Sequence, residues 1–93
     1  MTTLGPQAPV LANVASANSS TTLFSVTGRA LGRTIYNDST QVLYVKFGTT
    51  ATNSSYTVQM AAGAYYEFPQ PVYAGRVDGI WASANGNARV TSW

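Results

Sequence analysis

Acid–base chemistry in this chain could rest on only three carboxylates, those of Asp38, Glu67 and Asp78. The sequence has no histidine and no cysteine, which excludes nucleophile systems of the Ser–His and Cys–His types. Glu67 and Asp78 could lie on neighbouring strands with the carboxylate spacing that a glycosidase needs. An ion pair with an arginine, or exposure to water, is the better interpretation of each acid. We therefore expect a protein that binds and does not catalyse.

Metal, phosphate and nucleic-acid chemistry are also poorly supported by the residue types. No Asp-rich loop offers the converging oxygens of a calcium site, and the glycines at 75, 79 and 86 stand singly, unlike those of a phosphate-binding loop. The five Lys and Arg residues are scattered along the chain, whereas nucleic-acid binders cluster them on one face. We expect no cofactor, no metal and no nucleic acid.

Aromatic side chains are the best candidates for a binding site. Tyrosine and tryptophan combine an apolar ring with a hydrogen-bonding group, and they anchor many interfaces. Strand alternation predicts Tyr66 and Phe68 in the core, which leaves Tyr65 and Tyr73 for the surface. Trp93 either covers the domain's own core or docks on a neighbouring subunit.

The first 21 residues differ from the rest of the chain. Glycine and proline interrupt them, small polar residues follow, and neither a period of 2 nor one of 3.6 is sustained. We interpret residues 1–21 as an extended arm whose apolar side chains Leu4, Val10 and Leu11 contact a neighbouring subunit. The alternative is an ordinary disordered terminus.

Residues 22–93 predict an all-β domain. Short apolar or alternating runs separated by turn residues indicate six to seven strands, at 23–26, 33–36, 41–47, 56–60, 64–68, 76–81 and 88–93. Residues 41–47 are apolar on both faces, which predicts a central strand covered on both sides. The expected fold is a small antiparallel β-sandwich or flattened barrel with an extended N-terminal arm.

Turn signals predict how these strands are connected. Residues 61–63 and the pair Asn85–Gly86 each predict a hairpin, with Gly63 in a left-handed conformation. The polar segment 48–55 is expected to be a mobile loop tip, and Tyr56 should point inward with the next strand. Gly79 within a strand indicates a bulge or a close backbone approach.

Charged residues make up 9% of the 93 residues, against about 25% in an average protein. So few charges favour permanent burial against other proteins, although a surface of uncharged polar residues explains them equally well. No apolar run approaches the ~20 residues of a membrane span, and the first residues lack the features of a signal peptide. We expect no membrane association and synthesis in a cytoplasm.

Several segments resemble small structural proteins of tailed bacteriophages. They are Arg33-Thr-Ile-Tyr-Asn-Asp-Ser-Thr, Leu43-Tyr-Val-Lys-Phe-Gly, Tyr56-Thr-Val, Gly63-Ala-Tyr-Tyr-Glu-Phe-Pro and Gly75-Arg-Val-Asp-Gly-Ile-Trp-Ala. The resemblance implies a virion protein made in the host cytoplasm, most simply a head-decoration or cement subunit that stabilises the capsid lattice. Its partners would be the major capsid protein or other virion subunits, and a homo-oligomer such as a trimer is expected.

Two other functions stay open at this point. A neck, tail or fibre component would differ from a decoration protein mainly in copy number. A carbohydrate-binding or receptor-binding module would use Tyr65, Tyr73 or Trp81 as a stacking platform. The residues that we expect to contact partners are Leu4, Val10, Leu11, Tyr65, Tyr73 and Trp93.

Overall fold

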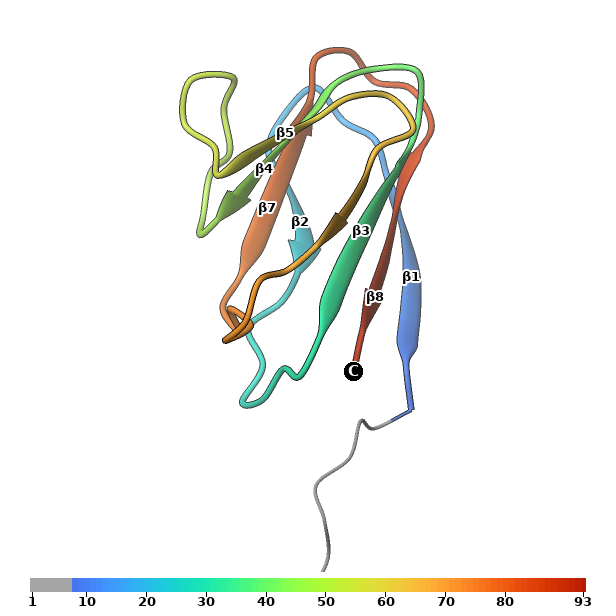
Figure 1. Cartoon of the computed structure of the whole chain (residues 1–93). Coiled ribbons are helices and arrows are strands. Elements are labelled where there is room, and N and C mark those ends of the chain that lie inside the picture. The colour runs from blue at the N-terminus through green and yellow to red at the C-terminus, as the bar shows by residue number, and fades with distance from the viewer. Residues whose placement is uncertain (1–7) are drawn as a thin grey trace, which may run out of the picture.

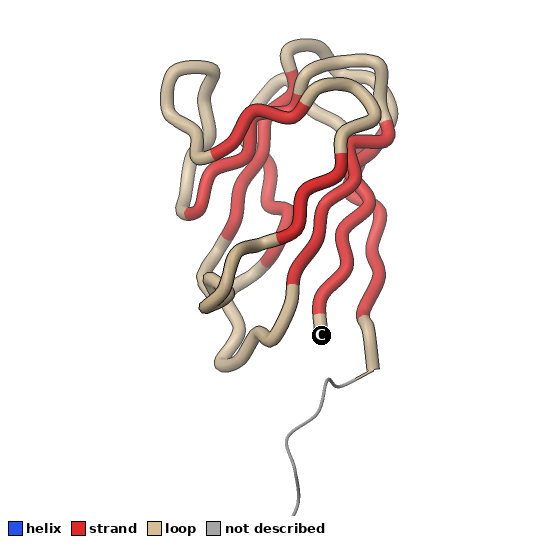
Figure 2. The backbone as a smooth tube through the Cα atoms, in the orientation of Figure 1, coloured by secondary structure: helices blue, strands red, loops and turns tan. Residues whose placement is uncertain are grey.

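The computed structural model describes residues 8–93, which contain eight β-strands and no helix. Two four-stranded antiparallel sheets face each other, in the orders β1-β8-β3-β6 and β2-β7-β4-β5 (Figures 1 and 2). We call them the first and the second sheet. The strands are β1 (Val10–Ala15), β2 (Thr21–Phe24), β3 (Arg33–Asp38), β4 (Leu43–Phe47), β5 (Val58–Met60), β6 (Tyr65–Glu67), β7 (Val77–Trp81) and β8 (Asn87–Ser92).

The strand pairing has the pattern of a jelly roll. The first strand pairs with the last, the second with the seventh, the third with the sixth and the fourth with the fifth, all antiparallel. Further pairing of β3 with β8 and of β4 with β7 closes this long folded ribbon into two sheets. Of the connections between these strands, only β4–β5 stays within one sheet. The sandwich predicted from the sequence is confirmed, with eight strands in place of six or seven.

The segment predicted to be an extended arm contributes a strand to the fold. Val10–Ala15 forms β1, and all six of its residues are paired with β8. Val14 packs against the core, whereas Val10 and Ala12, earlier on the same strand, are exposed. With only one apolar side chain of this strand on the core, alternation was too weak to predict it. Leu4 lies outside the described residues.

Both turn glycines were predicted correctly, but the hairpins were wrong. Gly63 and Gly86 have left-handed backbones, with φ of 75° and 70°. However, β5 and β6 lie in different sheets, and so do β7 and β8. A turn signal marks where the chain reverses, while the sheet that the returning strand joins depends on distant contacts.

Apolar side chains from both sheets fill the space between them. The buried core consists of Leu23, Phe24, Ile35, Leu43, Val45, Met60, Phe68, Val77, Trp81, Ala88 and Val90. Gly79 lies within this core, where an added Cβ would come 2.8 Å from Cδ1 of Leu23. The atoms nearest to that position belong to the side chains of Leu23 and Leu43, and not, as predicted, to a backbone segment. Tyr56 was wrongly predicted to point inward: it precedes β5 and is 40% exposed.

Strand β4 is central, between β7 and β5, but only one of its faces lies in the core. Leu43 and Val45 are fully buried, whereas Tyr44 and Lys46 on the other face are half-buried. The prediction of two covered faces was therefore wrong. Tyr44 and Lys46 are amphipathic side chains whose apolar parts resemble core residues in a sequence pattern.

One buried amide, that of Asn37, links the two sheets. Its Nδ2 donates to three main-chain carbonyls on two segments, those of Gln41 (2.8 Å) and of the adjacent Met60 (3.2 Å) and Ala61 (3.0 Å). Its Oδ1 accepts hydrogen bonds from Ser39 Oγ (2.7 Å) and from the indole Nε1 of Trp81 (3.3 Å). Asn37 is fully buried on β3 of the first sheet, while Trp81 lies on β7 of the second.

The buried Arg33 holds the opposite end of β3. Its guanidinium donates to the main-chain carbonyls of Ser25 (2.9 Å), Tyr73 (2.9 Å) and Gly75 (2.7 Å). Its Cζ also lies 4.7 Å from the centre of the Phe24 ring, within the range of a cation–π contact. Arg33 thereby fixes the β2–β3 and β6–β7 connections against the end of the sandwich.

Candidate functional site

Two surfaces on opposite sides of the sandwich carry the side chains best suited to binding. The first is the outer face of the first sheet. Strand register places Tyr65 beside Tyr36, Tyr36 beside Arg89, and Arg89 beside Asn13, in one row across β6, β3, β8 and β1. Leu11 follows Asn13 at the next outward position of β1. We call these five residues the tyrosine face.

The tyrosine face is exposed and its one charge is neutralised. Tyr65 and Leu11 are 63% and 74% exposed, and Tyr36 is 39% exposed. The Nε of Arg89 lies 2.7 Å from Oδ2 of Asp38, and its Nη1 donates to Oδ1 of Asn13 over 3.2 Å. These contacts hold the Arg89 side chain along the sheet, so the face presents two phenol rings and an oriented guanidinium.

The structure brings two of the predicted partner-binding residues, Leu11 and Tyr65, to this face, on its two edge strands. Val10 is exposed at the start of β1. Tyr73 lies elsewhere, with its ring stacked on that of Phe47 at 5.2 Å and 5°. The role of each in binding stays a prediction.

Two tryptophans considered for binding contact their own chain. The Trp93 ring lies directly over Gly32, and its main-chain N donates to the Gly32 carbonyl over 3.0 Å. The ring thus lies on a loop glycine and is not among the side chains packed on the core. Docking of Trp93 on a neighbouring subunit stays a prediction. Trp81 is 1% exposed. Its indole cannot serve as the stacking platform considered for it, because the core covers the ring.

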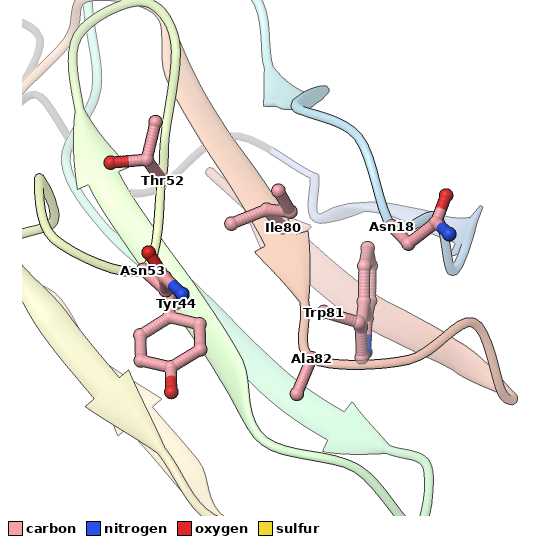
Figure 3. Close-up of a pocket in the computed structure, with 7 residues that line it drawn as sticks. All are labelled: Asn18, Tyr44, Thr52, Asn53, Ile80, Trp81 and Ala82. Atoms are coloured by element: carbon pink, nitrogen blue, oxygen red, sulfur yellow. The ribbon is translucent and has the colours of Figure 1, made fainter.

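The second surface is a pocket of about 310 Å³ beside the outer face of the second sheet. In Figure 3, Tyr44, Thr52 and Asn53 lie on one side and Asn18 on the other. Main chain and side chains at the end of β7 lie between them. The residues that line the pocket are Asn18, Tyr44, Thr52, Asn53, Ile80, Trp81 and Ala82.

The aromatic wall of the pocket is supported from behind. The rings of Tyr44 and Tyr56 are tilted at 54° with centres 5.0 Å apart. The hydroxyl of Tyr56 donates to Oε1 of Gln59 over 3.3 Å. Tyr44 therefore occupies a defined position, since a second ring restricts its rotation.

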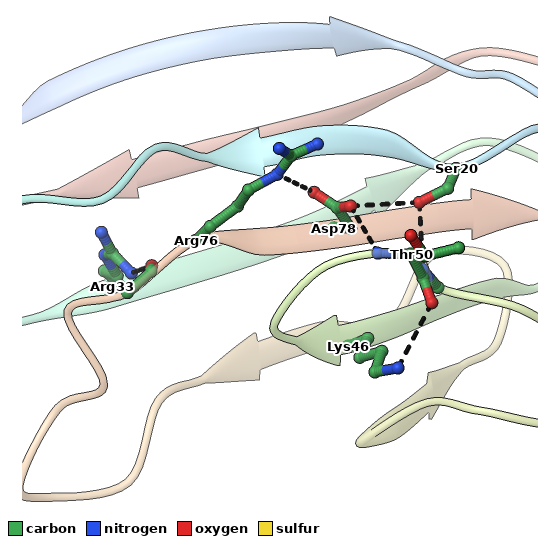
Figure 4. Close-up of polar contacts among 8 residues, drawn as sticks. Ser20, Arg33, Lys46, Thr50, Arg76 and Asp78 are labelled. Carbon is green, nitrogen blue, oxygen red and sulfur yellow. Dashed lines mark hydrogen bonds and ion pairs between the residues drawn. The ribbon is translucent and has the colours of Figure 1, made fainter.

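The loop that carries Thr52 and Asn53, on the same side of the pocket as Tyr44, is anchored to β7 by Asp78 (Figure 4). Oδ2 of Asp78 accepts hydrogen bonds from the main-chain N of Thr50 (2.8 Å) and from Ser20 Oγ (3.2 Å). Ser20 Oγ in turn accepts from the main-chain N of Ala51 (3.0 Å), and Arg76 Nε lies 2.8 Å from Asp78 Oδ1. The segment expected to be a mobile tip is thus held at several points.

The electrostatics of Asp78 favour its charged form. Burial alone would raise the pKa of its carboxyl, but the hydrogen bonds from Arg76, Thr50 and Ser20, with the charge of Arg76, hold that pKa below its usual value. Lys46 adds a second anchor, because its Nζ donates to Ser55 Oγ over 2.9 Å. Both charged groups therefore fasten the loop and do not line the pocket.

The acids do not form the pair that a glycosidase would need. Glu67 on β6 and Asp78 on β7 lie in different sheets, so they are not on neighbouring strands. Asp38 and Asp78 are each paired with an arginine, as the sequence suggested. Within residues 8–93, no three His, Cys, Asp or Glu side chains are grouped so as to hold a metal ion. The same residues contain no helix long and apolar enough to cross a membrane.

Searches against protein-family models, curated proteins and solved structures found no match for this chain. The functional argument therefore depends on the residues and geometry described above.

Of the residues that line the pocket, sequence reasoning named only Trp81 as a candidate for binding. Asn18, Tyr44 and Asn53 come from separate segments, and asparagines in loops are common turn residues. The usable signal was Tyr44, a large aromatic residue on the face of β4 that it shares with Lys46. Tyr36 of the tyrosine face was missed because its strand, Arg33–Asp38, shows no alternation of apolar and polar residues from which an outward face could be assigned.

Proposed function

We propose that this chain is a structural subunit of a tailed-bacteriophage particle, a decoration or cement protein that attaches to the capsid lattice through the tyrosine face. The observation that carries the proposal is the exposed row of Tyr65, Tyr36 and Arg89 beside Leu11. Tyrosine and arginine are enriched among the residues that dominate interface energetics. An arginine already oriented by Asp38 and Asn13 loses less side-chain entropy on binding.

The fold and the sequence add support of a more general kind. Jelly rolls occur in viral capsid domains, and also in lectins and cupins, so the topology is compatible with a particle protein without specifying one. Among capsid proteins, lectins and cupins, we choose a particle protein because several segments of the chain resemble tailed-phage structural proteins. The low charge content agrees with a surface that is largely covered in an assembly.

Attachment stabilises the particle by mass action. A protein that binds the assembled lattice, and not its separate subunits, shifts the equilibrium toward the assembled state. If several copies associate around a symmetry axis, as in a trimer, their combined attachment is stronger than that of one copy. The major capsid protein is the partner that this function requires, and a homo-oligomer is part of the proposal.

The first test is the copy number of this chain in purified particles of its source phage, measured by quantitative gel densitometry against the major capsid protein. A one-to-one ratio, or a simple fraction of it, is expected for a decoration protein. A handful of copies would favour the alternative of a neck, tail or fibre component. Absence from the particle would refute both.

The second test uses matched variants in a rebinding assay with particles that have been stripped of the protein. The double variant Tyr36→Ser with Tyr65→Ser should weaken rebinding at least tenfold, because truncation of each interface anchor costs about 2 kcal/mol. Tyr56→Ser is the control, since Tyr56 has nearly the same exposure as Tyr36 (40% and 39%) but lies by the second sheet. Equal rebinding of both variants would exclude the tyrosine face as the attachment surface.

A further inference from the structure

We propose that the pocket beside the second sheet binds one neutral sugar ring, a hexopyranose unit of a glycan. The pocket is lined by residues of the β1–β2 connection, of β4, of the β4–β5 loop and of the end of β7. It lies on the opposite side of the sandwich from the tyrosine face. The proposal is therefore separate from the attachment function and stands or falls without it.

The lining combines the two kinds of group that a sugar ring needs. Tyr44 and Ile80 provide apolar surface against which the C–H groups of a pyranose can lie. Asn18 and Asn53 carry amides, each with two N–H donors and one carbonyl acceptor; the Asn18 amide is turned away from the other labelled side chains in Figure 3 and would have to rotate to reach a ligand. An amide that both donates and accepts matches a pair of adjacent hydroxyl groups, which also donate and accept.

These two amides are not used by the fold. Within residues 8–93, neither the side chain of Asn18 nor that of Asn53 makes a hydrogen bond to the protein. By contrast, the amides of Asn37 and Asn85 are engaged with buried or main-chain partners. The polar capacity of the pocket is thus available to a ligand.

Charge and size narrow the class of ligand. No Asp, Glu, Lys or Arg lines the pocket, so a phosphate or carboxylate would lose its hydration without gaining a counter-charge. Its volume of about 310 Å³ lies at the lower end of the ~300–1,000 Å³ typical of small-molecule sites. Both observations favour one uncharged ring over a nucleotide or an acidic sugar.

The site is also largely formed before binding. Tyr56 holds Tyr44 from behind, and Asp78 fixes the loop that carries Asn53 through the main chain of Thr50. A preformed site avoids the entropic cost of ordering a loop. Protein–sugar contacts that are made by a few exposed groups are weak, so the affinity should be in the millimolar range.

The test is a titration of the full-length ¹⁵N-labelled protein, followed by amide chemical shifts, with glucose, galactose, mannose and N-acetylglucosamine in separate experiments. At least one sugar should shift the amide signals of Asn18, Asn53 and Ala82 in a saturable manner, with a dissociation constant of about 1 mM. Glucuronate and galacturonate are the charge controls and should bind at least tenfold more weakly than the best neutral sugar.

Variants assign the response to the pocket. Tyr44→Ala and Asn53→Ala should each raise the dissociation constant about tenfold, which corresponds to about 1.4 kcal/mol. Asn53→Ala lies in an exposed loop and keeps the result interpretable if Tyr44→Ala does not fold. Tyr65→Ala on the tyrosine face should bind sugar like the parent protein, and any loss of particle attachment by that variant would concern the other surface.

Three outcomes would overturn the proposal. The first is no shift at the pocket amides with any of the four sugars at about 50 mM, well above a millimolar dissociation constant. The second is a shift that persists unchanged in both Tyr44→Ala and Asn53→Ala. The third is equal or tighter binding of the acidic sugars, which would contradict the uncharged character of the site.

Discussion

Replacing Asn37 with alanine should destabilise the domain by about 3 kcal/mol. The substitution removes the only acceptor that the structure gives to Trp81 Nε1 within residues 8–93, and a buried donor left without a partner costs about 1–3 kcal/mol. It also removes the donor to the Met60 carbonyl and leaves a small cavity. Since a chain of this length has a total stability of about 5–14 kcal/mol, the loss is a substantial fraction.

Asn37→Asp tests the same amide without changing its shape. A carboxylate can still accept from Trp81 and Ser39, but its second oxygen would face carbonyl oxygens where Nδ2 now donates. Burial and these carbonyls would raise the pKa of the introduced carboxyl. The variant should therefore be least stable near pH 7 and should regain stability toward pH ~4, as protonation restores one donor.

Both variants can be measured by urea unfolding, followed by far-UV circular dichroism and by tryptophan fluorescence. Asn53→Ala is the control, because the Asn53 side chain makes no hydrogen bond within the described chain, and its stability should stay within ~0.5 kcal/mol of the parent. A loss below ~0.5 kcal/mol in Asn37→Ala, or a pH-independent Asn37→Asp, would refute the role assigned to this amide.

The remaining predictions concern three other positions and use the same unfolding assay. Arg33→Met should cost about 3 kcal/mol, since three carbonyls lose their donor at about 1 kcal/mol each; an unchanged midpoint would contradict this. Asp78→Asn should cost about 2 kcal/mol at pH 7. That difference should shrink below pH ~4, because a carboxyl with a lowered folded pKa stabilises only above its unfolded pKa. Val14→Ser should cost about 1–2 kcal/mol because Val14 packs on the core, whereas Leu11→Ser on the same strand should stay within ~0.5 kcal/mol; equal effects would argue that β1 is not part of the fold.

Short apolar or alternating runs bounded by turn residues predicted where most strands lie. This pattern placed β3, β4 and β7 within a few residues of their observed bounds, although burial alternates clearly only at the start of β4. It failed for β1, where alanine and asparagine dilute the pattern and only Val14 reaches the core. It also gave no partner for any strand, since pairing depends on residues that are far apart in sequence.

The binding surfaces were predictable only in part, for a related reason. Tyr65 was identified as exposed from strand alternation, whereas Leu11 was singled out only as an apolar side chain of an extended arm, before β1 was known to be a strand. That they share a face with Tyr36 and Arg89 follows from the register of β8 between β1 and β3. Predicting the pocket would have required the course of two loops as well, because Asn18 and Asn53 reach it from connections that are positioned by tertiary contacts.

Buried polar side chains, and not the turns, specify which sheet each returning strand joins. Because nearly every connection crosses from one sheet to the other, local hairpin energetics cannot specify this roll. Most of the connections are instead tied to a particular strand by hydrogen bonds that an alternative arrangement would leave unmade.

Three buried side chains make these hydrogen bonds, and they lie apart from the exposed residues of the binding surfaces. Asn37 joins β3 to the β5–β6 connection, Arg33 joins it to the β2–β3 and β6–β7 connections, and Asp78 joins β7 to the β1–β2 and β4–β5 connections. All three are nearly inaccessible to solvent. The groups that specify the fold are thereby separated from the outer faces, so Tyr36, Tyr65 and Tyr44 are free to change with a binding partner while the roll stays the same.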